Sequence, residues 1–246
     1  CEDSTSGRTN LCQKRQIISM PPREGAFADM VAIPSTHAIQ IPDHLSFDAA
    51  SLTEPLACGW HAVRLACRVH EGSLAGIKTA VIGGGAIGVG AALCLKAFGA
   101  DDIVILEPNA LRRDHLNAKL DIPVVDPATL GDSLDGGCRV VIDAVGYAAT
   151  RETACQLARQ GGVIMHIGLG QATGGIDVRR LTLQEITFIG TYTYTYQDFL
   201  DTAQAMADGK LGKLDWTETR PLSAGQQAFE DIRAGRVADP KIVLKP

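Results

Sequence analysis

The chain has 246 residues, of which 46% are hydrophobic and 21% charged, so it has the composition of an ordinary globular protein and can form one large or two smaller domains. A net charge of −5 with no basic run argues against a nucleic-acid surface. We find no signal peptide or lipidation motif, and seven cysteines, mostly in apolar segments, favour the reducing cytoplasm over a disulfide framework.

The first 45 residues predict short strands before helices take over. Residues 1–16 are polar and rich in turn formers. Residues 25–34 are expected to form a strand that a proline stops, and residues 38–41 another. Ser46 is then a candidate N-cap for a helix with an apolar face.

Glu54 lies between two apolar helical segments. We expect a carboxylate in such surroundings to be partly buried, and a buried carboxylate needs a cation, a metal or hydrogen-bond donors. The other interpretation is a first-turn helix acid beside Pro55 at the first helical position. The residues alone leave both interpretations open. His61 is expected to be a helix residue at the edge of the core rather than a ligand.

Residues 79–107 form a recognisable unit. Residues 79–82 predict a buried parallel strand, residues 86–98 a helix, and residues 103–106 a second strand that ends at Glu107. The first strand and the helix are joined by Gly83-Gly84-Gly85-Ala86-Ile87-Gly88, which is the pattern G-x-G-x-x-G, and the acid follows its third glycine by 19 residues. The unit predicts a dinucleotide-binding site; the alternative is a glycine-rich turn in another α/β protein.

Each part of this pattern has a physical role. Gly83 permits the tight turn, Gly85 lets the backbone approach a pyrophosphate, and Gly88 lets the helix pack closely on the sheet. The helix start offers N–H groups and a partial positive charge to the phosphates. Glu107 is expected to accept hydrogen bonds from the adenosine ribose and to repel a 2′-phosphate, which favours NAD over NADP.

The uncharged run at residues 79–95 does not predict a membrane span. It is shorter than the ~20 residues that a span needs. It also carries five glycines, so a buried strand followed by a helix explains it better.

The rest of the chain continues the alternation of helices and strands. We expect helices at residues 108–120, 150–159, 197–208 and 224–234, strands at residues 122–125, 139–143, 161–168, 185–192, 216–222 and 241–244, and one brief turn within residues 126–137. Since parallel sheets bind ligands at the carboxyl ends of their strands, Glu107, Gly146 and Gly168 are expected at one crevice. Arg112 either reaches the adenosine ribose or phosphate or lies on a solvated helix face.

This arrangement resembles the medium-chain dehydrogenase/reductase family, in particular its zinc-dependent alcohol and polyol dehydrogenases of the sorbitol, threonine and butanediol type. The motifs that carry the resemblance are GRTNLC at 7–12, GAFADMVAIP at 25–34, EPLACGWHAV at 54–63, IGGGAIG at 82–88, DAVG at 143–146 and PKIVL at 240–244. The resemblance implies an α/β fold in which a Rossmann doubly wound parallel sheet, residues 64–207, is inserted in a mainly β, GroES-like catalytic domain. Residues 1–63 and 208–246 would be the remaining part of that domain.

The resemblance also implies functional residues. Glu54 matches a glutamate that stands at the catalytic zinc as a direct or exchangeable ligand. Leu169, Thr191 and Thr193 match positions that line the nicotinamide pocket, and Arg112 matches a basic residue near the adenosine ribose. With the glycine pattern, the predicted cofactor-binding set is Gly83, Gly85, Ala86, Ile87, Gly88, Glu107, Arg112, Ala144, Val145, Gly146, Gly168, Leu169, Thr191 and Thr193.

Two departures from the family's pattern concern metal. Its structural zinc lobe carries four cysteines, of which Cys1 and Cys12 match the second and fourth, Ser4 stands at the third, and the first would precede the chain. The principal catalytic ligands, a cysteine and a His-Glu pair, would also lie upstream. We therefore expect a chain that lacks the N-terminal part, binds NAD and has little or no turnover, because Glu54 alone cannot hold a catalytic zinc.

The predicted function of the parent protein is hydride transfer between NAD and a secondary alcohol of a polyol or sugar-derived substrate, with zinc lowering the pKa of the hydroxyl. The alternatives are an FAD-dependent reductase, a zinc-free quinone or enoyl reductase of the same family, and a non-catalytic dinucleotide-binding module. No nucleic acid or membrane is expected as a partner. The apolar strand at residues 186–192, if it lies at the sheet edge, predicts a homodimer or homotetramer; an ordinary internal strand is the competing interpretation.

Overall fold

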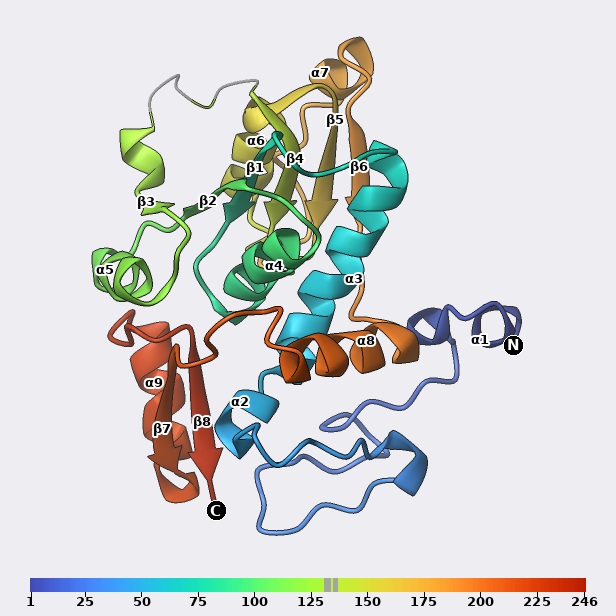
Figure 1. The fold of residues 1–246 in the computed structure, drawn as a ribbon, viewed down its shortest axis with the longest axis vertical. Helices are drawn as coiled ribbons and strands as arrows, with labels where there is room; N and C mark the ends of the chain where they lie inside the picture. Colours follow the sequence, from blue (N-terminus) through green and yellow to red (C-terminus); the bar gives the residue numbers. More distant parts are fainter. Residues whose placement is uncertain (131–133, 135–136) are drawn as a thin grey trace.

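A six-stranded parallel sheet forms the upper body of the molecule in Figure 1, which shows the computed structural model of the chain. The structure describes residues 1–130, 134 and 137–246. The strands run in the order β3-β2-β1-β4-β5-β6, and every neighbouring pair is parallel. Their bounds are β1 Lys78–Ile82, β2 Asp102–Leu106, β3 Val124–Val125, β4 Cys138–Asp143, β5 Ala158–His166 and β6 Thr187–Gly190.

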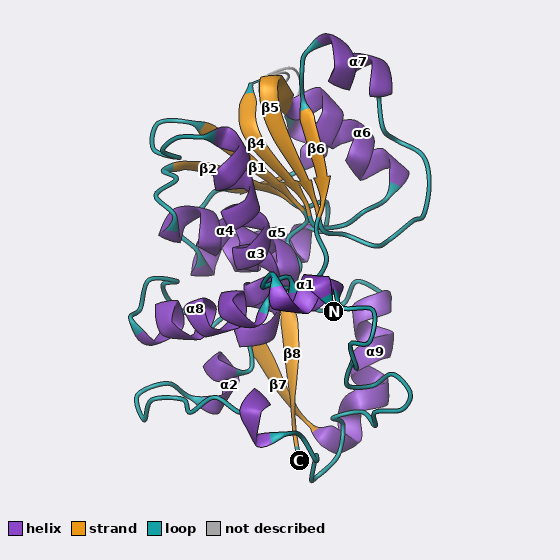
Figure 2. Cartoon of the chain, turned by 90° about the vertical axis from the view of Figure 1, so that its right-hand side faces the viewer, coloured by secondary structure: helices purple, strands orange, loops and turns teal. Residues whose placement is uncertain are grey.

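Helices cover both faces of this sheet, as Figure 2 shows. One face is covered by α3 (Thr53–His70), α4 (Ala86–Ala97) and α5 (Ala110–Lys119), and the other by α6 (Ala148–Leu157) and α7 (Val178–Leu183). Side chains alternate along each strand, so Val81 and Ile142 enter the core under the first group while Ala80 and Val141 enter the core under α6. The predicted doubly wound parallel sheet is confirmed.

Glycines allow α3 and α4 to cross closely. A Cβ atom on Gly59 of α3 would lie 2.7 Å from the backbone nitrogen of Ala91 in α4. A Cβ atom on Gly90 of α4 would lie 3.3 Å from the Leu56 side chain. Since real Cβ atoms do not approach a backbone to 2.7 Å, the residue at position 59 has to be glycine at this helix separation.

A second, two-stranded parallel sheet lies below the first in Figures 1 and 2. It consists of β7 (Thr217–Pro221) and β8 (Lys241–Lys245), which α9 (Gly225–Arg233) connects. The short helix α2 (Phe47–Ala50) is tied to it, because Asp48 pairs with Lys245 Nζ at 2.9 Å and accepts a hydrogen bond from Thr219 at 3.2 Å. The chain between the two sheets includes α8 (Tyr196–Ala207).

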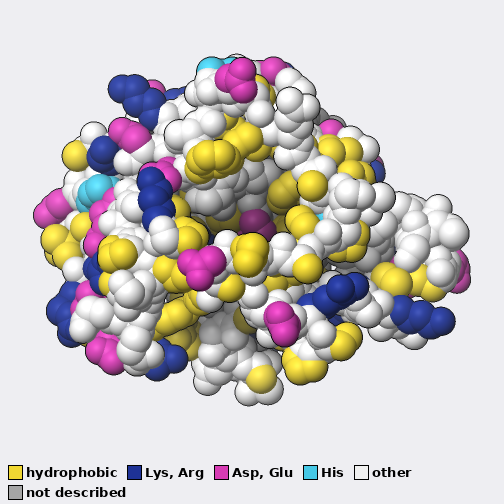
Figure 3. All heavy atoms as spheres, turned by 90° about the horizontal axis from the view of Figure 1, so that it is seen from below, with side chains coloured by type: hydrophobic (Ala, Val, Ile, Leu, Met, Phe, Trp, Pro, Cys, Tyr) yellow, Lys and Arg dark blue, Asp and Glu magenta, His cyan; other side chains and the backbone are white. Residues whose placement is uncertain are grey.

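The strands predicted at residues 25–34 and 38–41 are wrong. In the described chain before α2 there are only α1 (Glu2–Thr5) and the 3₁₀ turns η1 (Thr9–Leu11) and η2 (Ser35–His37). A strand needs a hydrogen-bonding neighbour, and β7 and β8 pair with each other rather than with this segment. Its apolar side chains remain exposed, Met30 to 90% and Phe27 to 68%, and apolar side chains are spread over the face seen from below in Figure 3.

The other predicted helices and strands are confirmed, with boundaries that shift by a few residues. The brief turn predicted within residues 126–137 corresponds to the 3₁₀ turn η3 (Pro127–Thr129), and the rest of that prediction lies partly outside the described residues. A further 3₁₀ turn, η5, covers Leu222–Ala224. Among the described helices, none is both long and apolar enough to cross a membrane.

Candidate functional site

The glycine turn after β1 leaves open space in front of α4. Gly83 has φ +103°, a left-handed value that favours glycine, and a Cβ atom on Gly88 would lie 1.8 Å from the Gly83 carbonyl oxygen. A Cβ atom on Gly85, the N-cap of α4, would meet nothing within 4 Å, and no side chain caps this helix end. Ala86 and Ile87 begin the helix, so its first N–H groups face open space beside Gly85, the kind of helix start that binds anions.

Glu107 holds its carboxylate beside this turn. The residue is 6% exposed; its Oε2 accepts a hydrogen bond from the Gly84 backbone nitrogen at 2.8 Å, and its Oε1 accepts one from the Asn109 backbone nitrogen at 2.9 Å. A carboxylate has about four acceptor sites, so two backbone donors leave capacity for two hydroxyl groups. The sequence spacing therefore predicted the position of this carboxylate correctly, at the end of β2 and next to the glycine turn.

Arg112 and Arg113, on the first turn of α5, have different contacts. Arg112 Nη2 donates to the Val237 carbonyl at 3.2 Å, and its buried Nε has no hydrogen-bond partner among the described residues. Arg112 therefore does not lie on a solvated helix face. Arg113 donates to the Glu107 carbonyl at 2.9 Å and pairs with Asp126 at 3.0 Å. The sequence motifs assigned no separate role to Arg113. In the structure its hydrogen bond supports the backbone of Glu107, the predicted ribose-binding acid.

The turns that follow β4 and β5 touch each other. Ala144, Val145 and Gly146 form the first turn, where buried Asp143 accepts hydrogen bonds from the Val145 and Gly146 backbone nitrogens at 3.0 and 2.9 Å. Gly146 has φ +81°, and a Cβ atom there would lie 2.2 Å from the Gly168 carbonyl oxygen. This contact brings five of the predicted cofactor-binding residues together at one end of the sheet, among them Leu169, which is 86% exposed.

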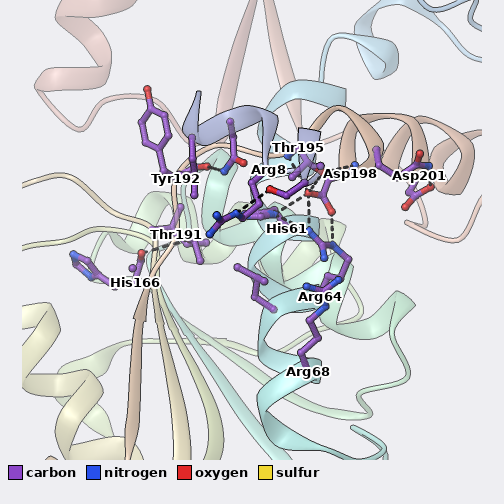
Figure 4. A pocket seen from close by; sticks show the side chains of 18 of the residues that line it. Arg8, His61, Arg64, Arg68, His166, Thr191, Tyr192, Thr195, Asp198 and Asp201 are labelled. Carbon is purple, nitrogen blue, oxygen red and sulfur yellow. Dashed lines mark hydrogen bonds and ion pairs between the residues drawn. The ribbon is translucent and has the colours of Figure 1, made fainter. Parts of the chain in front are cut away.

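A cavity of about 720 Å³ opens beside these turns. Figure 4 shows it between the ends of β5 and β6, the helix α3 and the N-terminal segment. Leu169, Thr191, Arg8, Arg64 and Arg68 are among the residues that line it, and Figure 4 shows Thr191 on the side of His166 and Arg64 and Arg68 along α3. Thr193 does not line this cavity and has φ +48°. Of the three predicted nicotinamide-pocket residues, the structure therefore brings two to this cavity.

A buried ionic cluster forms part of the same wall. His61 Nδ1 lies 2.7 Å from Asp198 Oδ2, and Arg64 Nε lies 2.5 Å from Asp198 Oδ1. Thr195 adds two hydrogen bonds to this carboxylate, from its backbone nitrogen at 2.9 Å and its hydroxyl at 2.6 Å. Burial by itself raises the pKa of Asp198, but the hydrogen bonds from His61, Arg64 and Thr195 outweigh it and hold the pKa well below its usual range.

The sequence could not reveal this cluster. His61 and Arg64 are three residues apart on α3, but Asp198 lies 137 positions after His61. The local signal was the cap of α8, where Thr195 and Asp198 form a capping box. His61 is buried and at hydrogen-bonding distance from an acid, in keeping with its interpretation as a core residue.

Glu54 lies in the first turn of α3, but it is exposed, so the predicted partial burial is wrong. The sequence patterns also missed its neighbours Cys58 and Tyr194. Burial, and then the charge of Glu54, raise the pKa of Cys58 to about 12. Burial, the charges of Glu54 and Cys58 and a hydrogen bond to Glu54 raise the pKa of the Tyr194 phenol.

Cys1 and Cys12 lie together at the N-terminal end of the described chain. Their sulfur atoms are 3.6 Å apart, and Ser4 Oγ lies 3.2 Å from Cys1 Sγ. This brings together the three residues that matched the structural zinc lobe, but only two of them carry sulfur. Within residues 1–130, 134 and 137–246, no group of three or more His, Cys, Asp or Glu side chains is arranged to hold a metal ion.

Comparison with protein families gives one match that bears on this site. The family described as "Zinc-binding dehydrogenase" matches residues 86–208, from the start of α4 to the end of α8. This range contains the Glu107 carboxylate and the turns after β4 and β5.

Individual proteins are similar over nearly the whole chain. L-galactonate-5-dehydrogenase of Escherichia coli (strain K12) is 32% identical over 94% of this chain and 68% of its own length. The (R,R)-butanediol dehydrogenase of Saccharomyces cerevisiae is 30% identical over 94% of this chain and 61% of its own length. Among solved structures, a putative zinc-binding dehydrogenase from Sinorhizobium meliloti 1021 bound to NADP has a TM-score of 0.83 and 26% identity, covering 100% of this chain and 73% of its own.

Proposed function

The chain belongs to the zinc-binding dehydrogenase family, and we propose that it supplies the dinucleotide site and part of the reaction site of an oxidoreductase that transfers hydride between NAD and a secondary alcohol. The observation that carries this proposal is the Glu107 carboxylate, buried at the end of β2 beside an uncapped helix start. The substrate is a small polyol or sugar-derived molecule, since relatives are named for galactonate and butanediol.

The residues of this chain bind and orient the dinucleotide. The open helix start at Gly85 receives the pyrophosphate, and the spare lone pairs of Glu107 accept the two adenosine ribose hydroxyls. The touching turns at Gly146 and Gly168, with Leu169 and Thr191, form the nicotinamide end. The chemistry that bound NAD supplies is the acceptance of hydride, and the protein contributes position and electrostatics.

Glu107 also favours NAD over NADP. A 2′-phosphate at the ribose would stand against the buried Glu107 carboxylate, and like charges placed side by side weaken binding. The structural relative from Sinorhizobium meliloti was solved with NADP, so NADP is the competing cofactor. An FAD-dependent reductase, a zinc-free reductase and a non-catalytic dinucleotide module are the competing functions, and titration of the chain separates the cofactors.

Zinc enters the proposal only at Glu54. A catalytic zinc needs three protein ligands and a structural zinc four, and the described residues hold no group of three metal-binding side chains. The residues present therefore do not fit a zinc ion by themselves, and we assign no step of the reaction to one. Accordingly we propose that residues 1–246 bind the dinucleotide with little or no turnover.

The cofactor assignment is tested by titrating the chain with NADH, NADPH and FAD in a calorimeter. We expect NADH to bind at least about 10-fold more tightly than NADPH, with no binding of FAD, because about 1.4 kcal/mol of charge repulsion gives that ratio. Glu107→Gln should weaken NADH binding and reduce the ratio of NADH to NADPH affinity. Glu152 is an exposed acid on α6, so Glu152→Gln should change neither the NADH affinity nor this ratio. Equal affinity for both dinucleotides, or preference for FAD, would overturn the assignment.

We also propose an arrangement for the whole molecule. Residues 64–207 form the dinucleotide-binding domain, with residues 1–63 and 208–246 as part of a catalytic domain. The helix α3 runs unbroken across the first of these boundaries, so the two parts share an element. The protein acts in the cytoplasm as a homodimer or homotetramer.

A further inference from the structure

Arg151 is a buried cation whose hydrogen bonds all go to backbone carbonyl groups. It lies in the first turn of α6 and is 4% exposed. Its Nε donates to the Gly174 carbonyl at 2.6 Å, Nη1 to those of Gly146 and Gln171 at 2.9 and 3.0 Å, and Nη2 to that of Thr173 at 2.6 Å. No carboxylate among the described residues pairs with it. A buried charge without a counter-ion is costly, so these four carbonyl groups are what makes its burial possible.

Three of the four carbonyl groups belong to the loop between β5 and α7. Residues 168–175 of this loop contain no helix or strand, and most of them are exposed. The loop also lies against the turn after β4, where the Gly170 and Gln171 backbone nitrogens donate to the Val145 and Gly146 carbonyl groups at 3.1 and 2.8 Å. Gly146 is the shared point, because its carbonyl oxygen accepts from both Gln171 and Arg151.

Glycines make this close approach possible. A Cβ atom on Gly168 would lie 2.1 Å from the Val145 carbonyl carbon, and one on Gly175 would lie 1.9 Å from the Ala148 carbonyl oxygen. A glycine-rich loop is flexible when nothing holds it, because its backbone has many accessible conformations. The loop therefore needs a strong restraint to keep one conformation at the edge of the site.

We propose that Arg151 is the positioning residue of the nicotinamide end of the site: it holds residues 168–175 against the turn after β4 and thereby fixes Gly168 and Leu169. This inference rests on the proposed dinucleotide site. Its physical basis is the planar guanidinium, which donates in several fixed directions at once. In the observed conformation the loop presents three carbonyl groups to that guanidinium, so burial of the charge stabilises this conformation. A lysine offers a point charge without the fork, and it would hold the loop less well.

The test compares Arg151→Met and Arg151→Lys with a matched control. Arg180→Met is that control, because Arg180 also donates only to backbone carbonyl groups, those of Cys155, Gln156 and Ala158, but at the far end of α6. Amide hydrogen exchange of the 246-residue chain is measured without dinucleotide. We expect exchange at Gly170 and Gln171 to become about 10-fold faster in Arg151→Met, less so in Arg151→Lys, and to stay unchanged in Arg180→Met.

NADH affinity is measured on the same proteins. We expect it to fall about 10-fold in Arg151→Met, to be partly recovered in Arg151→Lys, and to be unchanged in the control. The reason is that ordering a mobile loop on binding costs conformational entropy and so lowers the affinity. Unchanged exchange in a folded Arg151→Met chain, or equal loosening in the control, would overturn the inference. If Arg151→Met does not fold, Arg151→Lys carries the test by the same two measurements.

The two measurements separate the inference from the function on which it rests. Faster exchange in the Arg151 variants with no NADH binding by the wild-type chain would refute the dinucleotide site and leave the loop restraint in place. Normal NADH binding by the wild type and by all variants, with unchanged exchange, would refute the restraint and leave the dinucleotide site in place.

Discussion

Asp198 shows how single buried charges hold the wall of the cavity. Its carboxylate lies at hydrogen-bonding distance from three side chains and one backbone nitrogen, on α3 and at the start of α8. Arg64 binds this acid twice, because its Nη2 also donates to Asp198 Oδ2 at 3.1 Å. The cluster therefore joins α3 to the start of α8. Loss of this cluster would separate α3 from the start of α8 at the wall of the cavity that Figure 4 shows.

We predict that Asp198→Asn lowers the free energy of unfolding at pH 7 by about 3 kcal/mol, since it leaves Arg64 and His61 without their partner. The folded-state pKa of Asp198 is below its unfolded value, so its contribution is present above about pH 4 and is lost as the pH falls below that. The difference between wild type and variant should therefore shrink from pH 5 to pH 3. Urea unfolding over this range measures it.

Asp201→Asn is the control for that series, because Asp201 lies one turn further along α8 and, among the described residues, its side chain bonds only that of Gln197. We expect a change within about 0.5 kcal/mol at every pH. A loss for Asp198→Asn that stays constant down to pH 3 would contradict the role of the ionised carboxylate.

At the scale of elements, the crossing of α3 and α4 sets the position of the site. The helix α4 carries the phosphate-facing start, and α3 carries Glu54 at one end and the ionic cluster further along. Gly59 and Gly90 let the two helices approach, and buried side chains such as Leu56 and Leu93 fill the remaining contact. A shift of α4 relative to α3 would therefore move the proposed dinucleotide site relative to Glu54, the acid at the start of α3.

We predict that Gly59→Ala destabilises the chain by about 1–3 kcal/mol, because the added methyl group would lie 2.7 Å from the Ala91 backbone and force the helices apart. Gly190→Ala is the matched control, since a Cβ atom there meets nothing within 4 Å and the backbone angle is not restricted to glycine. Thermal unfolding of both variants provides the comparison. A Gly59→Ala chain as stable as the control would show that the helices can separate without cost.

At the scale of the whole molecule, the edge of the main sheet bears on assembly. The strand β6 pairs with β5 alone, so its outer backbone groups have no strand partner among the described residues. Its side chains Thr187, Phe188 and Ile189 are half-buried in the single chain. An unpaired edge of this kind favours addition of a strand from a second copy, which supports the proposed oligomer.

We predict that native mass spectrometry finds the chain as a dimer of 26.0 kDa subunits or a multiple of it, without stoichiometric zinc. The metal result follows because the described residues hold no complete ligand set. One zinc ion bound per chain at low free zinc would contradict it. A monomer at micromolar concentration would contradict the role given to the edge of β6.

The Rossmann unit could be predicted from the amino-acid sequence because its signals are local. The local pattern consists of three glycines, two apolar strands and an acid 19 residues after the third glycine. It predicted the turn at Gly83 and the position of Glu107, because the backbone of one strand–turn–helix–strand unit can adopt few conformations. The rule that ligands bind at the carboxyl ends of parallel strands likewise predicted that Gly146 and Gly168 lie together, and in the structure their turns touch. The same local reasoning failed at residues 25–34 and 38–41, where the predicted strands have no partner strand among the described residues.

Contacts between distant residues became visible only in the folded chain. Asp198 reaches His61 across 137 positions, and Arg151 reaches the carbonyl groups of a loop more than 20 positions away. The exposure of Glu54 likewise depends on what packs around the start of α3. The physical reason is that a charge, a hydrogen bond or a buried surface depends on distances through space, and a chain of this length can satisfy its local rules in many folds with different long-range contacts.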